Sequence, residues 1–342
     1  MSQTEKQFKK KRANRQSELF LDVGAGTVRL MRQGWNNRSS SITIENPADK
    51  EEQNRATAEA LNTVFGGIDR RKRVATLLPS TAVFSRVRHL SPALAANSKL
   101  RLFVEFELLQ QIPFSLDQII YDFDILDRDD DGGYEVLIVA VKRDVALQKI
   151  KMVNDAGYRV NFLGVNSIAT YNWLNRYGLI QPGLAVVDVG CQHTEVLCLG
   201  KPYAQSGHCS PLFRSISLGG ADITSALSQE LGIAYPEAEK GKMGLIPLRC
   251  TGPAVQKILS NLVSEISRSI AYFNGLRDSR KICQIWLTGE GSLMPGIDEL
   301  LKERLGVEVD RIISDDGFWI PTAGLNFQYL YPEHGLDINL AP

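Results

Sequence analysis

Residues 19–31 read Leu-Phe-Leu-Asp-Val-Gly-Ala-Gly-Thr-Val-Arg-Leu-Met: a short apolar strand, a turn of small residues and a second strand. Glycine supplies the backbone freedom that such a tight turn requires, so the stretch predicts a hairpin. Residues 184–199 repeat the pattern as Leu-Ala-Val-Val-Asp-Val-Gly-Cys-Gln-His-Thr-Glu-Val-Leu-Cys-Leu, so that Asp-Val-Gly follows an apolar strand at both Asp22 and Asp188. Two halves with the same beginning predict an internally duplicated, two-lobed α/β fold.

A third turn of small residues follows a later apolar strand at 282–287 and reads Gly289-Glu290-Gly291-Ser292. Such turns can point backbone N–H groups at phosphate oxygens, and an Asp at a strand end can hold a hydrated Mg²⁺ ion. One such turn alone is more often a simple hairpin, but three in this order predict a nucleotide pocket. The chain has no G-x-x-x-x-G-K-[ST] and no G-x-G-x-x-G after its first strand, which excludes a P-loop and a dinucleotide fold.

The composition limits the class of protein. With 342 residues, 44% of them hydrophobic and 23% charged, the chain is an ordinary globular protein of several subdomains. Its formal net charge is zero, so no overall field draws it to nucleic acid or to anionic lipid. Five cysteines without a C-x-x-C pair favour a reducing cytoplasm over a disulfide framework or a metal site.

Neither a membrane span nor a signal peptide is predicted, because no apolar run approaches the roughly 20 residues that a bilayer requires. Residues 1–17 are polar and basic, and we expect a solvated, disordered tail. Contact of this tail with a membrane surface is the alternative.

A block with a different pattern lies between the two Asp-Val-Gly stretches. Residues 100–111 predict a helix that has Leu102, Phe103, Phe106 and Leu109 on one apolar stripe. Around it we expect a break at Ile112-Pro113-Phe114, strands at 121–125 and 136–141 joined by an acidic turn at 129–133, and a helix at 143–156 that ends at Gly157. These elements form a compact α+β unit of about 75 residues.

Further elements are predicted outside this block. They are a helix at 51–65, a strand at 74–79, a helix from Gly219-Gly220 to Leu231, a long amphipathic helix at 255–276 and a helix at 297–305. Residues 315–342 contain prolines and show no helical stripe.

The order of the three turns resembles the actin, Hsp70 and sugar-kinase superfamily, in which two D-x-G hairpins clasp the phosphates and a late glycine turn meets the adenosine. The block narrows the resemblance to the PilM family of type IV pilus assembly proteins, which is similar to the cell-division protein FtsA. The stretches that carry it are Phe-Glu-Leu-Leu-Gln-Gln-Ile-Pro-Phe-Ser-Leu-Asp at 106–117, residues 121–126, residues 136–143, Leu231-Gly232 followed by Glu237-Ala238-Glu239, and residues 265–269. The resemblance extends over Glu18 to Asn326.

The resemblance implies an actin/Hsp70-like fold with an inserted FtsA/PilM-type subdomain. Its parts are a first lobe at 18–82 and 159–182, the inserted subdomain at 83–158, a second lobe at 183–230 and 281–330, a smaller subdomain at 231–280, and a tail at 331–342. It implies ATP and Mg²⁺ as ligands, with Asp22 and Asp188 holding the metal through water. The matching nucleotide positions are Asp22, Gly24, Ala25, Gly26, Thr27, Arg29, Asp188, Gly190, Gln192, His193, Thr194, Gly219, Gly220, Glu239, Lys242, Gly289, Glu290, Gly291 and Ser292.

Three positions depart from the catalytic members of the superfamily. Cys191-Gln192-His193 replaces a loop of small residues, and Glu290 stands within a loop that commonly reads Gly-Gly-Gly. Asn166 stands where related ATPases have an acidic residue, and Asn cannot accept a proton from water. We therefore expect nucleotide binding with slow hydrolysis, His193 as a packed or exposed loop residue, and an unreactive Cys191 thiol. For Glu239 and Lys242, a solvated helix face is the alternative.

The last seven residues, Leu-Asp-Ile-Asn-Leu-Ala-Pro at 336–342, resemble the Ile-Asn-Leu-Leu-Pro motif at the cytoplasmic start of PilN, the membrane partner of PilM. The resemblance implies a tail whose Ile338, Asn339 and Leu340 fill its own groove or that of a neighbouring copy; an untethered terminus is the alternative. Candidate groove residues are Ile112, Pro113 and Phe114, for which a buried structural turn is equally open.

The function implied is that of a cytoplasmic scaffold, peripheral to the inner membrane, in a type IV pilus or type II secretion-like platform. It would recruit the N-terminal peptide of a PilN-type bitopic protein, with possible self-association through its tail. The first alternative is an FtsA-like filament protein, and the second is a sugar-kinase-like phosphotransferase.

Overall fold

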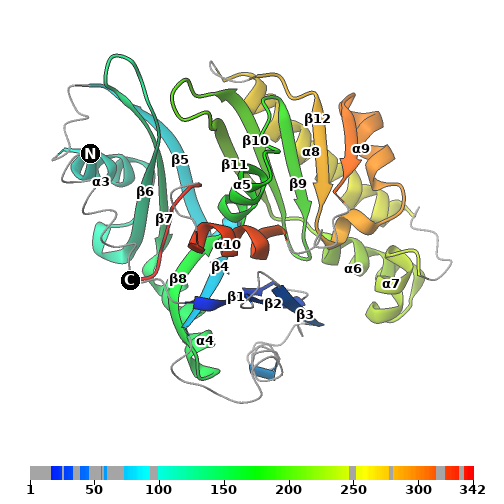
Figure 1. Cartoon of the computed structure of the whole chain (residues 1–342). Helices are drawn as coiled ribbons and strands as arrows, with labels where there is room; N and C mark the ends of the chain where they lie inside the picture. The colour runs from blue at the N-terminus through cyan, green and yellow to red at the C-terminus, as the bar shows by residue number, and fades with distance from the viewer. Residues whose placement is uncertain are drawn as a thin grey trace. The chain divides into compact units, whose positions relative to one another are not determined.

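The structure is a computed structural model of the whole chain (Figure 1), and it contains two compact units. The residues it describes are 17–24, 27–33, 39–45, 55, 58–59, 73–92, 99–245, 252–276, 280–312, 320–330 and 335–342. The first unit takes in residues 1–179, 203–208 and 319–342, and the second takes in 180–202 and 209–318. The predicted basic tail, the turn residues Ala25 and Gly26, and most of the helix predicted at 51–65 lie outside the described residues.

The first unit is built on a mixed five-stranded sheet. Across the sheet, the strands are β3 (Ser39–Glu45), β2 (Thr27–Gln33), β1 (Ser17–Val23), β4 (Arg73–Leu78) and β8 (Arg159–Val165). β1 pairs with β2, and β2 with β3, in antiparallel register, whereas β4 runs parallel to both β1 and β8. The Asp-Val-Gly hairpin is therefore the β1–β2 connection, as predicted, and β8 is the last strand on its side of the sheet.

Side chains from alternate strand positions pack on opposite faces of this sheet. Leu19 and Leu21 face a cluster that includes Val153 of helix α4 (Arg143–Asp155). Phe20, between them, faces the other cluster, which includes Ala169 of α5 (Asn166–Arg176) and residues of α10 (Ile320–Leu330). The period of two is what a sheet covered on both faces requires.

The chain returns to the first unit after it has formed the second. We expected the second lobe to extend to residue 330 and found no helical stripe in residues 315–342, but residues 320–330 form α10, which lies in the first unit and packs along α5. Leu325 and Tyr329 of α10 are buried, and Tyr329 makes edge-on ring contacts with Phe20 and Phe162. Because α10 is covered on several sides, its sequence lacks the one-sided apolar stripe of a surface helix.

The inserted subdomain is an antiparallel sheet of β5 (Val83–Leu90), β7 (Tyr134–Lys142) and β6 (Ile119–Arg128), with β7 in the centre. The helix α3 (Leu100–Gln111) has the predicted ends. It buries Leu100, Val104 and Leu108 against the sheet, however, and not the predicted stripe. Three members of that stripe are exposed, namely Leu102 (64%), Phe106 (58%) and Leu109 (53%).

Polar contacts with the sheet explain why α3 packs through this side. Glu107 accepts a hydrogen bond from Arg88 of β5 at 2.7 Å, and Glu105 accepts one from Tyr121 of β6. Both glutamates therefore lie beside the sheet. Apolar residues occur all round this helix, so its hydrophobic pattern alone did not select the buried side.

The second unit repeats the sheet of the first. Across it, the strands are β11 (Cys209–Ile216), β10 (Thr194–Pro202), β9 (Leu184–Val189), β12 (Gln284–Thr288) and β13 (Glu308–Arg311). β10 is antiparallel to both β11 and β9, and β12 is parallel to both β9 and β13. Strand order and direction are thus the same in both units, which confirms the predicted duplication.

Four helices of the second unit are α6 (Gly220–Leu231), α7 (Tyr235–Lys242), α8 (Pro253–Asn274) and α9 (Ile297–Leu305). α6, α8 and α9 contribute buried apolar side chains to one core with β9 and β12, including Ile223, Ile266 and Leu301.

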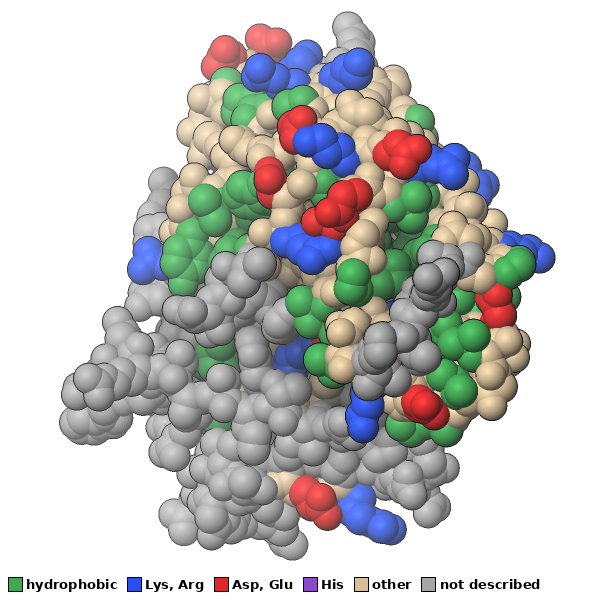
Figure 2. All heavy atoms as spheres, turned by 90° about the vertical axis from the view of Figure 1, so that its right-hand side faces the viewer, with side chains coloured by type: hydrophobic (Ala, Val, Ile, Leu, Met, Phe, Trp, Pro, Cys, Tyr) green, Lys and Arg blue, Asp and Glu red, His purple; other side chains and the backbone are tan. Residues whose placement is uncertain are grey.

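On the face shown in Figure 2, acidic and basic side chains are interspersed with apolar ones, and no large area of one charge sign gathers among the residues coloured there.

Candidate functional site

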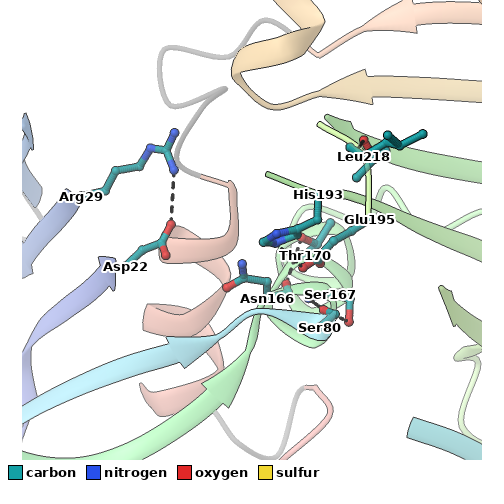
Figure 3. A network of polar contacts seen from close by, with 10 residues as sticks. Asp22, Arg29, Ser80, Asn166, Ser167, Thr170, His193, Glu195 and Leu218 are labelled. Atoms are coloured by element: carbon teal, nitrogen blue, oxygen red, sulfur yellow. Dashed lines mark hydrogen bonds and ion pairs between the residues drawn. The ribbon is translucent and has the colours of Figure 1, made fainter. Parts of the chain in front are cut away.

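The first Asp-Val-Gly hairpin brings charged groups together at the end of β1. Asp22 is buried and forms an ion pair with Arg29 of β2 at 3.3 Å (Figure 3). The N–H of Gly24 donates to the carbonyl of Thr27 at 2.9 Å and closes the turn. Lys149, from α4, donates to the carbonyl of Val23 at 3.0 Å.

Lys149 is a site residue that the sequence did not reveal, because it lies more than a hundred residues from the hairpin. Burial lowers the pKa of its ammonium group to about 8, and the Asp22 carboxylate acts in the opposite direction. The ammonium is therefore still largely protonated at pH 7. Asp22, Arg29 and Lys149 together carry one net positive charge, which suits an anion such as phosphate.

In the second unit, residues predicted to bind nucleotide lie close together in three loops: the second Asp-Val-Gly turn, the start of α6 at Gly219-Gly220, and the turn at 289–292. The N–H groups of Gly220 and Ala221 donate to the carbonyls of Gly190 and Cys191 at 2.9 and 2.8 Å. A Cβ on Gly220 would lie 3.0 Å from the Lys242 amine and 4.0 Å from the Gly291 Cα. The tighter approach is at Gly219, where a Cβ would lie 2.4 Å from the Cys191 carbonyl oxygen, so glycine there allows the start of α6 to approach the second loop closely.

Glu239 and Lys242 of α7 face this convergence. The Lys242 amine is buried and donates to the Glu239 carboxylate at 2.8 Å and to the carbonyl of Gly220 at 3.3 Å. Thr224 of α6 also donates to Glu239. This pair is tied to the glycine loops, which argues against the alternative of a solvated helix face.

The third loop packs on the end of β9. Gly289 has φ +84°, and a Cβ there would lie 2.2 Å from the Asp188 carboxylate. A Cβ on Gly291 would lie 2.4 Å from the Val189 side chain. Ser292 donates from its hydroxyl to the carbonyl of Gly289 at 2.6 Å. The Gly-Glu-Gly-Ser turn is thus held against the second Asp-Val-Gly.

The residues that depart from catalytic relatives have ordinary packing partners. The His193 ring lies 3.8 Å from the buried Glu195 carboxylate (Figure 3). Burial is the main cause that raises the pKa of the Cys191 thiol, with the charge of Glu290 second, so the thiol stays protonated and unreactive. This agrees with the prediction for Cys191.

Asn166 begins α5, at the position predicted for it, beside a hydroxyl pair. Ser80 donates to the Ser167 hydroxyl at 2.8 Å and accepts the Ser167 N–H at 3.1 Å (Figure 3). The side-chain oxygen of Asn166 is buried and accepts no hydrogen bond from the described residues. An amide there can orient water but cannot act as a base.

No cluster of three or more His, Cys, Asp or Glu side chains suitable for a metal occurs among the described residues. Asp22 and Asp188, the predicted metal contacts, belong to different units. Because Asp22 is already paired with Arg29, the first hairpin fits Mg²⁺ only in company with phosphate oxygens.

A second candidate site lies wholly in the first unit and holds the C-terminal tail (Figure 1). Leu336, Ile338 and Leu340 are buried, with exposed fractions of 2%, 0% and 0%, whereas Asp337 and Asn339 between them are partly exposed. This alternation is that of an extended peptide whose every second side chain enters a pocket. The residues Ile338, Asn339 and Leu340, predicted to dock, therefore contact their own unit.

Two edge strands and two helices bind the backbone of this tail. On β6, Asp124 and Asp122 accept the N–H groups of Asp337 and Asn339 at 2.8 and 2.9 Å. On β8, Leu163 accepts the Leu340 N–H at 2.8 Å and donates its own N–H to the Asn339 side chain at 3.0 Å.

The helices α5 and α10 supply side-chain amides. Asn172 of α5 both donates to the Leu336 carbonyl at 2.9 Å and accepts the Leu336 N–H at 2.7 Å. Gln328 of α10 donates to the Ile338 carbonyl at 2.9 Å. The tail groove, as we call it, is formed by Asp122, Asp124, Leu163, Asn172 and Gln328.

The candidate groove residues from the sequence lie elsewhere in the subdomain. Ile112 and Phe114 pack against its core, and the Lys142 amine lies 4.3 Å from the centre of the Phe114 ring. Pro113 is exposed between them. This packing supports the alternative of a structural turn, and the tail's hydrogen bonds go to other residues.

This architecture is shared with proteins of known family. Two sheets of the same strand order, each with a D-x-G hairpin, define the actin-like ATPase fold. The sequence profile of the type IV pilus assembly protein PilM family matches residues 37–316. The chain belongs to this family.

Solved structures agree on the fold. One chain of a PilM–PilN type IV pilus biogenesis complex aligns with a TM-score of 0.77 and 21% identity, covering 93% of this chain and 100% of that one. The ethanolamine utilization protein EutJ from Carboxydothermus hydrogenoformans aligns with a TM-score of 0.54 and 14% identity, covering 92% and 91%.

A curated relative matches over a shorter stretch. Type II secretion system protein L of Xanthomonas campestris pv. campestris is 29% identical over 128 residues, which are 37% of this chain and 32% of that protein. The match thus spans about a third of the relative's length. Among the helices that the structure describes, none is both long and apolar enough to cross a membrane.

Proposed function

We propose that this chain is a cytoplasmic scaffold in the inner-membrane platform of a type IV pilus or a type II secretion-like system. Its first unit binds the N-terminal peptide of a PilN-type membrane protein, which brings the scaffold to the inner membrane. Its glycine loops bind ATP with Mg²⁺ and hydrolyse it slowly, because Asn166 cannot accept a proton.

The observation that carries this proposal is the tail groove. An extended peptide of alternating apolar residues is seated there, and its Ile-Asn-Leu resembles the PilN motif. Membership of the PilM family and the solved complex of PilM with PilN support the same role. The net positive charge at the first hairpin and the converging glycine loops of the second unit support an anionic ligand with a phosphate chain.

Peptide binding tests the scaffold role. Because the tail fills the groove, we expect a chain that lacks residues 336–342 to bind a synthetic peptide containing Ile-Asn-Leu-Leu-Pro with a dissociation constant of about 1–100 µM. The same shortened chain carrying Asp122→Ala and Asp124→Ala should bind at least about tenfold more weakly, since two N–H acceptors are lost. Calorimetric titration measures both, and a scrambled peptide is the control. Absence of binding to the shortened chain would contradict the scaffold role.

Nucleotide binding is expected to depend on both Asp-Val-Gly turns. Asp22→Ala and Asp188→Ala should each weaken the binding of ATP with Mg²⁺ by at least about tenfold, because each removes a carboxylate that we propose holds the hydrated Mg²⁺ ion. Asp131→Ala, in an exposed turn of the inserted subdomain, is the matched control and should leave the affinity unchanged. If ATP affinity is the same in all three variants, the loops do not hold the nucleotide.

A further inference from the structure

The chain fills the tail groove with its own C-terminal residues. We infer that residues 336–342 are a resident ligand, which occupies the peptide site in cis and must leave before a peptide of the same pattern can bind. The inference rests on the proposed function, because it concerns the regulation of the same groove.

The groove recognises an extended backbone between two sheet edges. Among the strands that the structure describes, β6 and β8 are each the last of their sheet, and an edge strand leaves polar groups without a neighbouring strand. The tail bonds the side-chain carboxylates of Asp122 and Asp124 on β6 and the backbone of Leu163 on β8, so only β8 uses its own backbone edge in the bonds described. An exposed sheet edge commonly binds an added strand or an extended peptide.

None of these contacts depends on the covalent connection between the tail and α10. The contacts to Asp122, Asp124, Asn172 and Gln328 all bind backbone N–H or carbonyl groups of the tail, which every peptide carries. A peptide from another protein can therefore make the same hydrogen bonds. The covalent connection only raises the local concentration of the tail.

Asn339 is the position at which the groove selects a side chain. The side-chain amide oxygen of Asn339 accepts the backbone N–H of Leu163 at 3.0 Å and that of Ala341 at 3.1 Å. The backbone N–H of Asn339 donates to the Asp122 carboxylate at 2.9 Å. Aspartate would keep an acceptor there but bring a second negative charge close to Asp122. The groove therefore selects peptides with the order apolar, any residue, apolar, asparagine, apolar.

Competition between the tail and a labelled peptide tests the inference. The probe is a fluorescein-labelled peptide with the sequence of residues 335–342, and the proteins are the full chain, its Ile338→Asp variant and its Pro342→Ser variant. Ile338 is fully buried, so aspartate there should unseat the tail; Pro342 is exposed and serves as the control. With a tail concentration of about 1 mM in cis and an intrinsic dissociation constant of about 10 µM, the full chain should bind the probe about 100-fold more weakly than Ile338→Asp.

Equal affinity of the full chain and Ile338→Asp for the probe would overturn the inference. If the same two proteins also bind the Ile-Asn-Leu-Leu-Pro peptide equally well, only the resident-ligand inference fails; if neither binds any peptide, the proposed function fails with it. A chain ending at Gly335 provides a second readout, since added probe should restore the melting temperature that the shortened chain has lost. A concentration-dependent dimer that disappears in Ile338→Asp would place the tail in a second copy and overturn its assignment in cis.

Discussion

A Gly324→Ala chain is expected to lose about 3–5 kcal/mol of the free energy of unfolding of its first unit. A Cβ at position 324 of α10 would lie 1.8 Å from the Ala169 carbonyl oxygen of α5 and 2.5 Å from the carbonyl carbon. The obstacle is backbone, so no rotamer change relieves it and the two helices must move apart. This loss outweighs the gain of about 1 kcal/mol that alanine brings to a helix interior.

Urea unfolding and hydrogen–deuterium exchange of peptides from α5 and α10 would measure the effect of Gly324→Ala. The control is Gly275→Ala at the end of α8, where a Cβ would meet its nearest atom at an ordinary 3.5 Å; it should change stability by less than about 0.5 kcal/mol. Asn172 of α5 and Gln328 of α10 both bind the tail, so separating the helices should also expose residues 336–340 to exchange. Similar stability losses in the two variants would show that the helix contact is not the cause.

The duplicated sheets could be predicted from the sequence because their signals are local. A short apolar run followed by Asp-Val-Gly predicts a strand and its turn without reference to the rest of the chain. The same holds for α9, whose residues Ile297–Leu305 were predicted to the residue. The match in strand order between the two units follows from this repeated pattern.

The features that depend on tertiary contacts could not be predicted in the same way. The packing side of α3 is decided by Arg88 and Tyr121 on neighbouring strands, and the described side chains of α10 are nearly all buried, so they show no helical period. Lys149 reaches the first hairpin from α4, and the groove residues come from four separate elements. The extended binding of the tail could be predicted from its sequence, because the alternating apolar residues of a peptide ligand are consecutive in the chain.

The second large effect is expected from Gly289→Ala, in the third loop of the second unit. Position 289 has φ +84° and ψ 166°, a region almost restricted to glycine that costs an L-residue about 1–3 kcal/mol, and the new Cβ would lie 2.2 Å from the Asp188 carboxylate and 2.6 Å from the Val189 carbonyl. We expect a total loss of about 3–5 kcal/mol of unfolding free energy, because both obstacles belong to the adjoining loop. If this loop holds the nucleotide as proposed, the affinity for ATP should fall at least about 100-fold as well.

Gly296→Ala is the control. Gly296 also has a positive φ (+83°), but its ψ of 0° places it in the left-handed helical region, and a Cβ there would have no atom within 4 Å. Alanine at 296 therefore incurs the backbone cost of about 1 kcal/mol and no steric contact, and should leave ATP binding intact. The difference between the two variants in urea unfolding measures the contact of the third loop with Asp188 and Val189 together with the higher backbone cost at position 289. An equal loss in both would mean that backbone strain alone determines the stability of this turn, and that glycine at 289 is not needed for close approach to the second Asp-Val-Gly.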